Sequence, residues 1–383
     1  MMSTARTAIR AAVLGAALLV LLVPAAMADG KANANDVARI LAGLSIAETS
    51  PLAPFTKSSA WQSHAKHFDA AWARLDKGQL AKIRAWSAKY IPEHQPVMFY
   101  MFSGPDFLYA DAFYGDADTY VLSALEPVGP IPSLEGMSTG QLARELGELQ
   151  RSVNSVLSYS FFITKKMKTQ LRGGRLQGTL PVLYLFLARS GKTIEDVSYV
   201  EIDPQGKLTT IADEQTGKGT KGAKITFKGD DGKTRTLYYF ATNLANDGVK
   251  TSGFLQFCAD LGRGDSLVKS ASYLMHMNYF STVRDFILDH SAVLVQDDSG
   301  IPLRDFKRDD WNLYPFGNYL GPISIFPGKY QRDLRALYMR DHAGAIDFGI
   351  GYRWRPRQSN LLLAISKVSS TAQGDQADEP AQQ

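Results

Sequence analysis

The stretch from Val97 to Glu126 constrains the fold most, because its pattern changes twice within about thirty residues. Residues 97–102 (VMFYMF) are apolar and aromatic throughout, which is typical of a strand buried on both faces. Ser-Gly-Pro-Asp ends this run, residues 107–114 predict a short helix, and residues 120–125 predict a second strand. A strand, a helix and a strand at this spacing are the minimum for a parallel crossover, so we expect a sheet that contains parallel strands.

The flanking segments predict a mixed α/β fold, with helices on the faces of a mixed sheet and an antiparallel β-meander. Hydrophobic residues make up 45% of the chain, which is enough for a substantial core. Residues 179–191 (TLPVLYLFLARSG) fit a core helix or a strand, because periodicity cannot decide at this length. The expected organisation is a helical segment at 29–96, a main α/β region at 97–368 with the meander at about 197–242, closing strands at 346–355 and 360–366, and a disordered tail at 369–383. Whether the main region is one domain or two stays open.

The first 28 residues have the pattern of a cleaved secretory signal. Arg6 and Arg10 precede an apolar run over residues 11–23, which is shorter than the roughly 20 residues that a membrane span needs. Small residues at Ala26 and Ala28 then offer a cleavage site. We therefore expect a periplasmic or secreted protein with no transmembrane segment after cleavage; the alternative is an uncleaved N-terminal anchor.

Charge and cysteine content exclude several classes. The formal net charge is +4, and loss of Arg6 and Arg10 with the signal lowers it to +2, without the basic stripe of a nucleic-acid-binding protein. Cys258 is the only cysteine, so no intrachain disulfide can form, and its apolar neighbours indicate a buried thiol. The chain contains no phosphate-binding glycine loop and no zinc-protease motif, so no cofactor and no metal is expected. His64 and His67 have helical spacing but lack a third ligand.

Acidic residues follow several of the expected strands. Ligands bind beyond the carboxyl ends of strands in open α/β sheets, and Asp106, Glu126, Asp297 and Asp298 occupy such positions. They are candidates for an acid and base pair, with His276 as a further candidate. Each aspartate also has a structural explanation, since Asp106 can cap a helix and Asp297-Asp298-Ser299-Gly300 is a common turn sequence.

Candidate ligand contacts come from two other places. Ser103 follows the first strand, but the nucleophile-elbow pattern Gly-x-Ser-x-Gly is incomplete around it, and Tyr109 lies on the following helix. Arg353, Trp354 and Arg355 lie in GIGYRWRPR, where a strand would place the arginines on one face, able to hold a carboxylate or phosphate. The alternative for the arginines is a charged edge strand that prevents aggregation.

Several segments together resemble a family of exported bacterial proteins of unassigned activity. They are FSGPDFLYADAFY with YVLSALEPVG, then ASYLMH, FSTVRDFIL, QDDSGIP and FGIGYRWR, in that order. The resemblance implies no catalytic residues. Three functions are expected: binding of a small or oligomeric envelope ligand such as a sugar or peptide, hydrolysis by paired carboxylates, or a structural role without a pocket. The sequence does not decide whether the chain is an enzyme.

Overall fold

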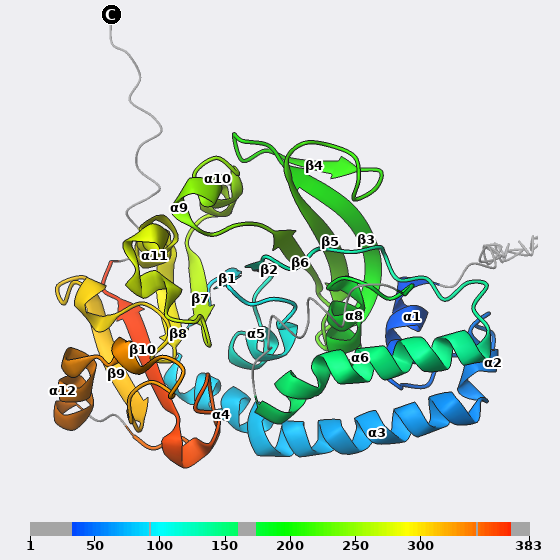
Figure 1. Ribbon diagram of the computed structural model, residues 1–383, viewed down its shortest axis with the longest axis horizontal. Coiled ribbons are helices and arrows are strands. Elements are labelled where there is room, and N and C mark those ends of the chain that lie inside the picture. Colours follow the sequence, from blue (N-terminus) through cyan, green and yellow to red (C-terminus); the bar gives the residue numbers. More distant parts are fainter. Residues whose placement is uncertain (1–32, 92, 160–173, 342–343, 369–383) are drawn as a thin grey trace, which may run out of the picture. The chain divides into compact units, whose positions relative to one another are not determined.

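A ten-stranded mixed sheet forms the centre of the computed structural model, which describes residues 33–91, 93–159, 174–341 and 344–368 (Figure 1). The expected signal and the expected C-terminal tail lie outside these residues. The strand order is β4-β3-β5-β6-β2-β1-β7-β8-β10-β9. The strands are β1 (Val97–Met101), β2 (Thr119–Ala124), β3 (Thr193–Ile202), β4 (Leu208–Ile211), β5 (Thr220–Lys228), β6 (Thr234–Ala241), β7 (Gly264–Val268), β8 (Ser291–Gln296), β9 (Trp311–Gly317) and β10 (Asn360–Ser366).

Five neighbouring strands in the middle of the sheet run parallel: β6, β2, β1, β7 and β8. Antiparallel strands flank them, with β5, β3 and β4 on one side and β10 and β9 on the other. The mixed α/β fold, the parallel crossover and the β-meander are therefore confirmed. The described residues fall into one compact unit.

Helices cover both faces of the sheet. One apolar core forms beneath α1 (Ala34–Leu41), α3 (Ser59–Leu75), α4 (Ala81–Tyr90), α5 (Phe107–Phe113), α6 (Thr139–Tyr159) and α8 (Leu180–Arg189), with the short α2 (Ala53–Thr56) at its margin and a π-helical turn, Asp76–Leu80, between α3 and α4. The second core involves α9 (Asn246–Val249), α10 (Phe254–Asp260), α11 (Ser281–His290) and α12 (Arg332–Arg340).

Strand β1 shows why the centre of the sheet is apolar on both faces. Met98 and Tyr100 pack into the first core, whereas Val97, Phe99 and Met101 pack into the second. Side chains alternate between the faces of a strand, so a strand between two helical layers needs apolar residues at every position. The expectation of a doubly buried strand is confirmed.

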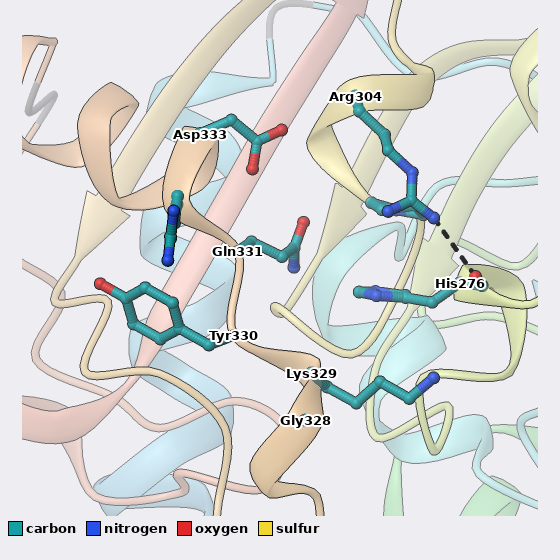
Figure 2. A pocket seen from close by; sticks show the side chains of 9 residues that line it. His276, Arg304, Gly328, Lys329, Tyr330, Gln331 and Asp333 are labelled. Atoms are coloured by element: carbon teal, nitrogen blue, oxygen red, sulfur yellow. Dashed lines mark hydrogen bonds between the residues drawn. The ribbon is translucent and has the colours of Figure 1, made fainter.

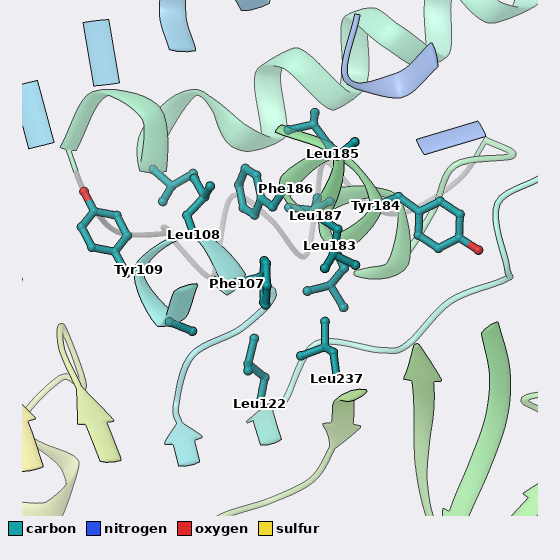
Figure 3. Packing of buried hydrophobic residues seen from close by; sticks show 14 of the residues in the cluster. Phe107, Leu108, Tyr109, Leu122, Leu183, Tyr184, Leu185, Phe186, Leu187 and Leu237 are labelled. Carbon is teal, nitrogen blue, oxygen red and sulfur yellow. The ribbon is translucent and has the colours of Figure 1, made fainter. Parts of the chain in front are cut away.

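Residues 180–189, which the sequence left open between helix and strand, form α8. All its positions from Leu180 to Ala188 are buried, and Figure 3 shows its side chains packed among those of Phe107, Leu122 and Leu237. A helix that is apolar on all sides is stable only inside a protein. Cys258 of α10 is also fully buried, and burial raises the pKa of its thiol well above the usual value.

Two sequence expectations differ from the structure. Strand β7 was not expected, because Gly264, Asp265 and Ser266 interrupt its apolar pattern. The strand expected at 346–355 is wrong: this segment consists of turns with a single isolated bridge between Ile350 and Arg353. The chain folds back so tightly that a Cβ at Gly349 would lie 1.5 Å from the carbonyl oxygen of Trp354.

Candidate functional site

Strained backbone gathers at the carboxyl ends of two neighbouring parallel strands. In the described part of the chain, four residues other than glycine have positive φ: Phe102 after β1, and Ser270, Ser272 and Tyr273 after β7. Their φ angles lie between 52° and 64°, in the left-handed region that costs such residues free energy. Strain of this kind concentrates at functional sites, so this edge of the sheet is a candidate functional site.

A buried ion pair joins the two strained loops. The Lys269 ammonium group lies 2.7 Å from Oδ2 of Asp106, and the exposed fractions of the two side chains are 2% and 1%. Tyr100 donates a hydrogen bond to the same oxygen (2.9 Å), and the ammonium lies 4.2 Å from the centre of the Tyr109 ring. Asp106 also caps α5, since its Oδ1 accepts from the Tyr109 amide (3.4 Å). Lys269 was not among the sequence candidates because the strand before it, β7, was not predicted.

Asp297 is held by the backbone around it. Its carboxylate accepts hydrogen bonds from the Ser299 hydroxyl (2.5 Å) and from the amides of Ser270 and Tyr352 (both 3.3 Å). Burial and the neighbouring Asp298 carboxylate raise the pKa of Asp297 to about 7. Asp297 therefore fastens the turn after β8 to the loop after β7.

The Asp298 carboxylate is hydrogen-bonded to side chains from other elements. Its carboxylate accepts hydrogen bonds from the Tyr273 hydroxyl (2.7 Å) and the Asn360 amide (3.0 Å), and burial raises its pKa. The space that Asp297 and Asp298 line together with Gln331 and Tyr338 is too small for a water molecule. The two carboxylates are thus adjacent, as the sequence suggested, but enclosed.

The remaining sequence candidates lie at separate positions. Glu126 is buried after β2, where its carbonyl accepts from Tyr239 (2.8 Å). The Ser103 hydroxyl donates to the carbonyl of Gly104 (2.8 Å). Arg353 donates to the carbonyls of Gly321 (2.6 Å) and Pro322 (3.0 Å), which ties down a loop. The exposed Arg355 lies over the ring of Trp354, and the common strand face expected for the arginines is absent.

A pocket of about 380 Å³ opens beside the turn that follows β8. Its wall comes from the 3-10 turns η2 (Leu274–His276), η4 (Leu303–Asp305) and η5 (Pro327–Lys329) and from the start of α12. Figure 2 shows Arg304, His276 and Lys329 on one side and Asp333 on the other. The volume falls in the range of small-molecule sites. The lining residues are His276, Pro302, Arg304, Gly328, Lys329, Tyr330, Gln331, Arg332 and Asp333.

Gln331 connects this pocket to the enclosed carboxylates. Its amide nitrogen donates to the carbonyl of Asp298 (3.0 Å), and its amide oxygen accepts from the Leu303 amide (3.0 Å). Tyr319 accepts a hydrogen bond from the backbone of Gln331 (2.8 Å). These three contacts fix the wall of the pocket to the carboxyl end of β8.

His276 is the one sequence candidate that lines the pocket. Burial, Lys329 and Arg304 lower the pKa of His276 to about 4, against a smaller opposite effect of the carbonyls of Gly300 and Asp298. The ring is therefore neutral at pH 7. The charged lining residues were not among the sequence candidates because no motif marks them: Arg304, Lys329, Arg332 and Asp333.

The described residues hold no cluster of three or more His, Cys, Asp or Glu suited to a metal ion. His64 has structural partners for both ring nitrogens, the carbonyl of Leu41 (2.8 Å) and the amide of Gln150 (2.9 Å). Within the same ranges, no helix has both the length and the apolar character needed to cross a bilayer.

Comparison of the chain with protein-family models, with curated proteins and with solved structures finds no match. The resemblance to exported bacterial proteins therefore stays a prediction from the sequence. Conclusions about activity have to come from the site itself.

Proposed function

We propose that this chain is an exported protein of the cell envelope, periplasmic or secreted, that binds a small or oligomeric ligand in the pocket beside β8. Export is supported by the N-terminal sequence, in which two arginines precede a short apolar run and a small-residue cleavage site. One observation carries the binding function. The pocket of about 380 Å³ lies at the carboxyl edge of the parallel strands, with charged side chains from three separate segments around it.

The burial of the carboxylates counts against the hydrolase alternative. Acid and base catalysis requires a carboxyl group within hydrogen-bond reach of the substrate. Asp106 is paired with Lys269, and Asp297 and Asp298 enclose a space too small for water. Among the described residues, no opening leads a substrate to these carboxyl groups, whereas the pocket beside β8 is open.

Filling the pocket tests the binding function. A Cβ added at Gly328 meets no atom within 4 Å, so Gly328→Trp should place an indole over the pocket without disturbing the fold. Gly140→Trp, at an exposed position in α6 that is equally free of contacts, is the matched control. The assay is a thermal-shift screen with envelope sugars and peptides, in which a ligand at 100 times its dissociation constant adds about 2.7 kcal/mol to the free energy of unfolding.

We expect at least one compound to stabilise the unmodified chain and the Gly140→Trp control but not Gly328→Trp. A ligand that stabilises Gly328→Trp equally would place binding elsewhere. A screen in which no compound stabilises the chain would favour the structural role without a ligand.

A further inference from the structure

We propose that this pocket binds the phosphate group of a phosphate monoester, carried on a small polyhydroxylated molecule. The inference rests on the proposed binding function and adds the chemical class of the ligand. The charge of the lining, the directions from which its donors come and the position of Asp333 support it.

The lining has an excess of positive charge. Arg304, Lys329 and Arg332 face a single acidic residue, Asp333, so the lining carries a net charge of +2 with His276 neutral. Within the described ranges, neither Lys329 nor Arg332 has an ion-pair partner. Cations held together without counter-charge repel one another, and a dianion would balance them.

Arg304 is also available to a ligand. Its Nε lies 3.8 Å from Oδ1 of Asp305. The other oxygen of that carboxylate is closer to the guanidinium group of Arg284, at 3.0 Å. The other contact of Arg304 is a hydrogen bond to the carbonyl of His276 (3.3 Å), drawn in Figure 2, and its side chain is 63% exposed. The bond to the carbonyl orients the guanidinium, and Asp305, which pairs more closely with Arg284, balances its charge only in part.

The donors reach the pocket from several directions. Arg304 belongs to η4, Lys329 to η5 and Arg332 to the first turn of α12. A carboxylate presents two oxygens in one plane, whereas a phosphate monoester presents three terminal oxygens in a tetrahedral arrangement and a charge near −2. Donors from three segments therefore suit a phosphate group better than a carboxylate.

One further feature supports the same ligand. His276 contributes only a neutral ring to the wall, because its Nε2 is buried out of reach of the pocket. Helix α12 has nine residues and lacks a side-chain cap at Gln331. The Leu334 amide of its first turn donates to Asp333, so the amides of Arg332 and Asp333 add N–H groups and a favourable dipole at the same place.

Asp333 explains why the rest of the ligand should carry hydroxyl groups. Its Oδ1 accepts a hydrogen bond from the Leu334 amide (2.9 Å), and its carboxylate lies across the pocket from Arg304 in Figure 2. An ionised carboxylate accepts hydrogen bonds and would repel a second phosphate. A ligand with one phosphate group and several hydroxyl groups would match both sides of the pocket: the phosphate faces the cations, and the hydroxyl groups donate to Asp333.

Isothermal titration at about pH 7.5, above the second phosphate pKa of about 6, tests this with glucose 6-phosphate as the probe. Glucose and succinate are the uncharged and dicarboxylate comparisons. We expect glucose 6-phosphate to bind at millimolar concentration or below, and glucose not to bind. Lys329→Ala and Arg332→Ala should each weaken binding about tenfold, the equivalent of one charged contact.

Arg340→Ala is the matched control, because Arg340 is also exposed on α12 but pairs with Asp341 outside the pocket. It should leave the affinity for glucose 6-phosphate unchanged. Absence of binding at millimolar concentration, or equal binding by a Lys329→Ala/Arg332→Ala double variant, overturns the proposal.

Inorganic phosphate and the comparison compounds separate the remaining outcomes. If inorganic phosphate binds as tightly as glucose 6-phosphate, the monoester assignment fails because Asp333 contributes nothing. If succinate or a neutral sugar binds and Gly328→Trp abolishes that binding, the pocket is a ligand site but phosphate is the wrong class. If no probe and no compound of the envelope screen binds, the proposed function fails as well.

Discussion

The Lys269 ammonium group lies 2.7 Å from Oδ2 of Asp106, and this pair connects the carboxyl ends of the adjacent parallel strands β7 and β1. Both side chains are almost completely buried. Removing one member of a buried ion pair leaves an uncompensated charge, whereas removing both members leaves none. The pair therefore holds two strained loops together, and its contribution can be measured with substitutions at both positions.

We predict that Asp106→Asn and Lys269→Met each lower the free energy of unfolding by about 3–5 kcal/mol. Asparagine keeps the capping function at the start of α5, so its effect reports on the charge and not on the cap. The double variant should cost clearly less than the sum of the two single variants. Urea unfolding measures all three, and strict additivity would contradict the pairing.

Asp297 should make the protein less stable as the pH rises. Its pKa is about 7 in the folded protein and near 3.8 when unfolded, so the folded state holds the proton more tightly between these values. The free energy of unfolding therefore falls from about pH 4 to about pH 7, by at most about 1.4 kcal/mol per pH unit for this group. Asp298, whose pKa is also raised, acts in the same direction.

Asp297→Asn removes this titration, so unfolding of the variant and of the unmodified chain should be compared across the same pH range. We expect the stability of the variant relative to the unmodified chain to increase with pH. Asp289→Asn, an exposed position on α11, controls for the change in net charge. A difference between variant and unmodified chain that is constant with pH would mean that Asp297 is ionised throughout.

The pKa of His276 should depend on its cationic neighbours. Burial, Lys329 and Arg304 hold its pKa at about 4, below the usual 6.5, so the unfolded state binds the proton more tightly between these values. This histidine therefore contributes stability above about pH 6.5 that is lost as the pH falls towards 4. Lys329→Ala should raise the pKa of His276, whereas Arg340→Ala should not.

The chemical shift of the His276 ring against pH measures this pKa by NMR, with His276→Gln assigning the signal. The assignment is necessary because the pKa of His64 is also lowered to about 4 by burial. An unchanged pKa in Lys329→Ala would show that Lys329 does not contribute to lowering it.

The sequence predicted the β1–α5–β2 unit because each part of it has a local cause. Residues 97–101 are apolar throughout, Asp106 caps the helix that follows, and the second strand is mostly apolar. Such features depend on neighbours in the chain, which a pattern shows directly.

Strand β7 could not be predicted in this way because distant residues satisfy its polar groups. Asp265 accepts from the Gln95 amide (3.0 Å), and the Ser266 hydroxyl pairs with that of Ser291 (2.7 Å). Without these partners, Gly264-Asp265-Ser266 has the composition of a loop. Missing β7 removed Lys269 from the candidate residues.

The charged pocket could not be predicted from the sequence for a similar reason. Arg304, Lys329 and Arg332 belong to three short segments without a common motif, and only the fold brings them to one cavity. The arginines of the 353–357 segment had the pattern of an anion site. Because the chain turns tightly around Gly349 and Gly351, Arg353 instead donates a hydrogen bond to the carbonyl of Gly321 in a neighbouring loop.

The turn at Gly351 supplies the last prediction, because it presses against the Asp297 carboxylate. Gly351 has a φ of +71°, and a Cβ there would lie 1.6 Å from Oδ2 of Asp297. Gly104 has a similar φ of +58°, but a Cβ there meets nothing within 4 Å. We expect Gly104→Ala to cost only the backbone penalty of about 1–2 kcal/mol, and Gly351→Ala to cost more because Asp297 must also move. Urea unfolding compares the two variants, and equal costs would show that the carboxylate is free to shift.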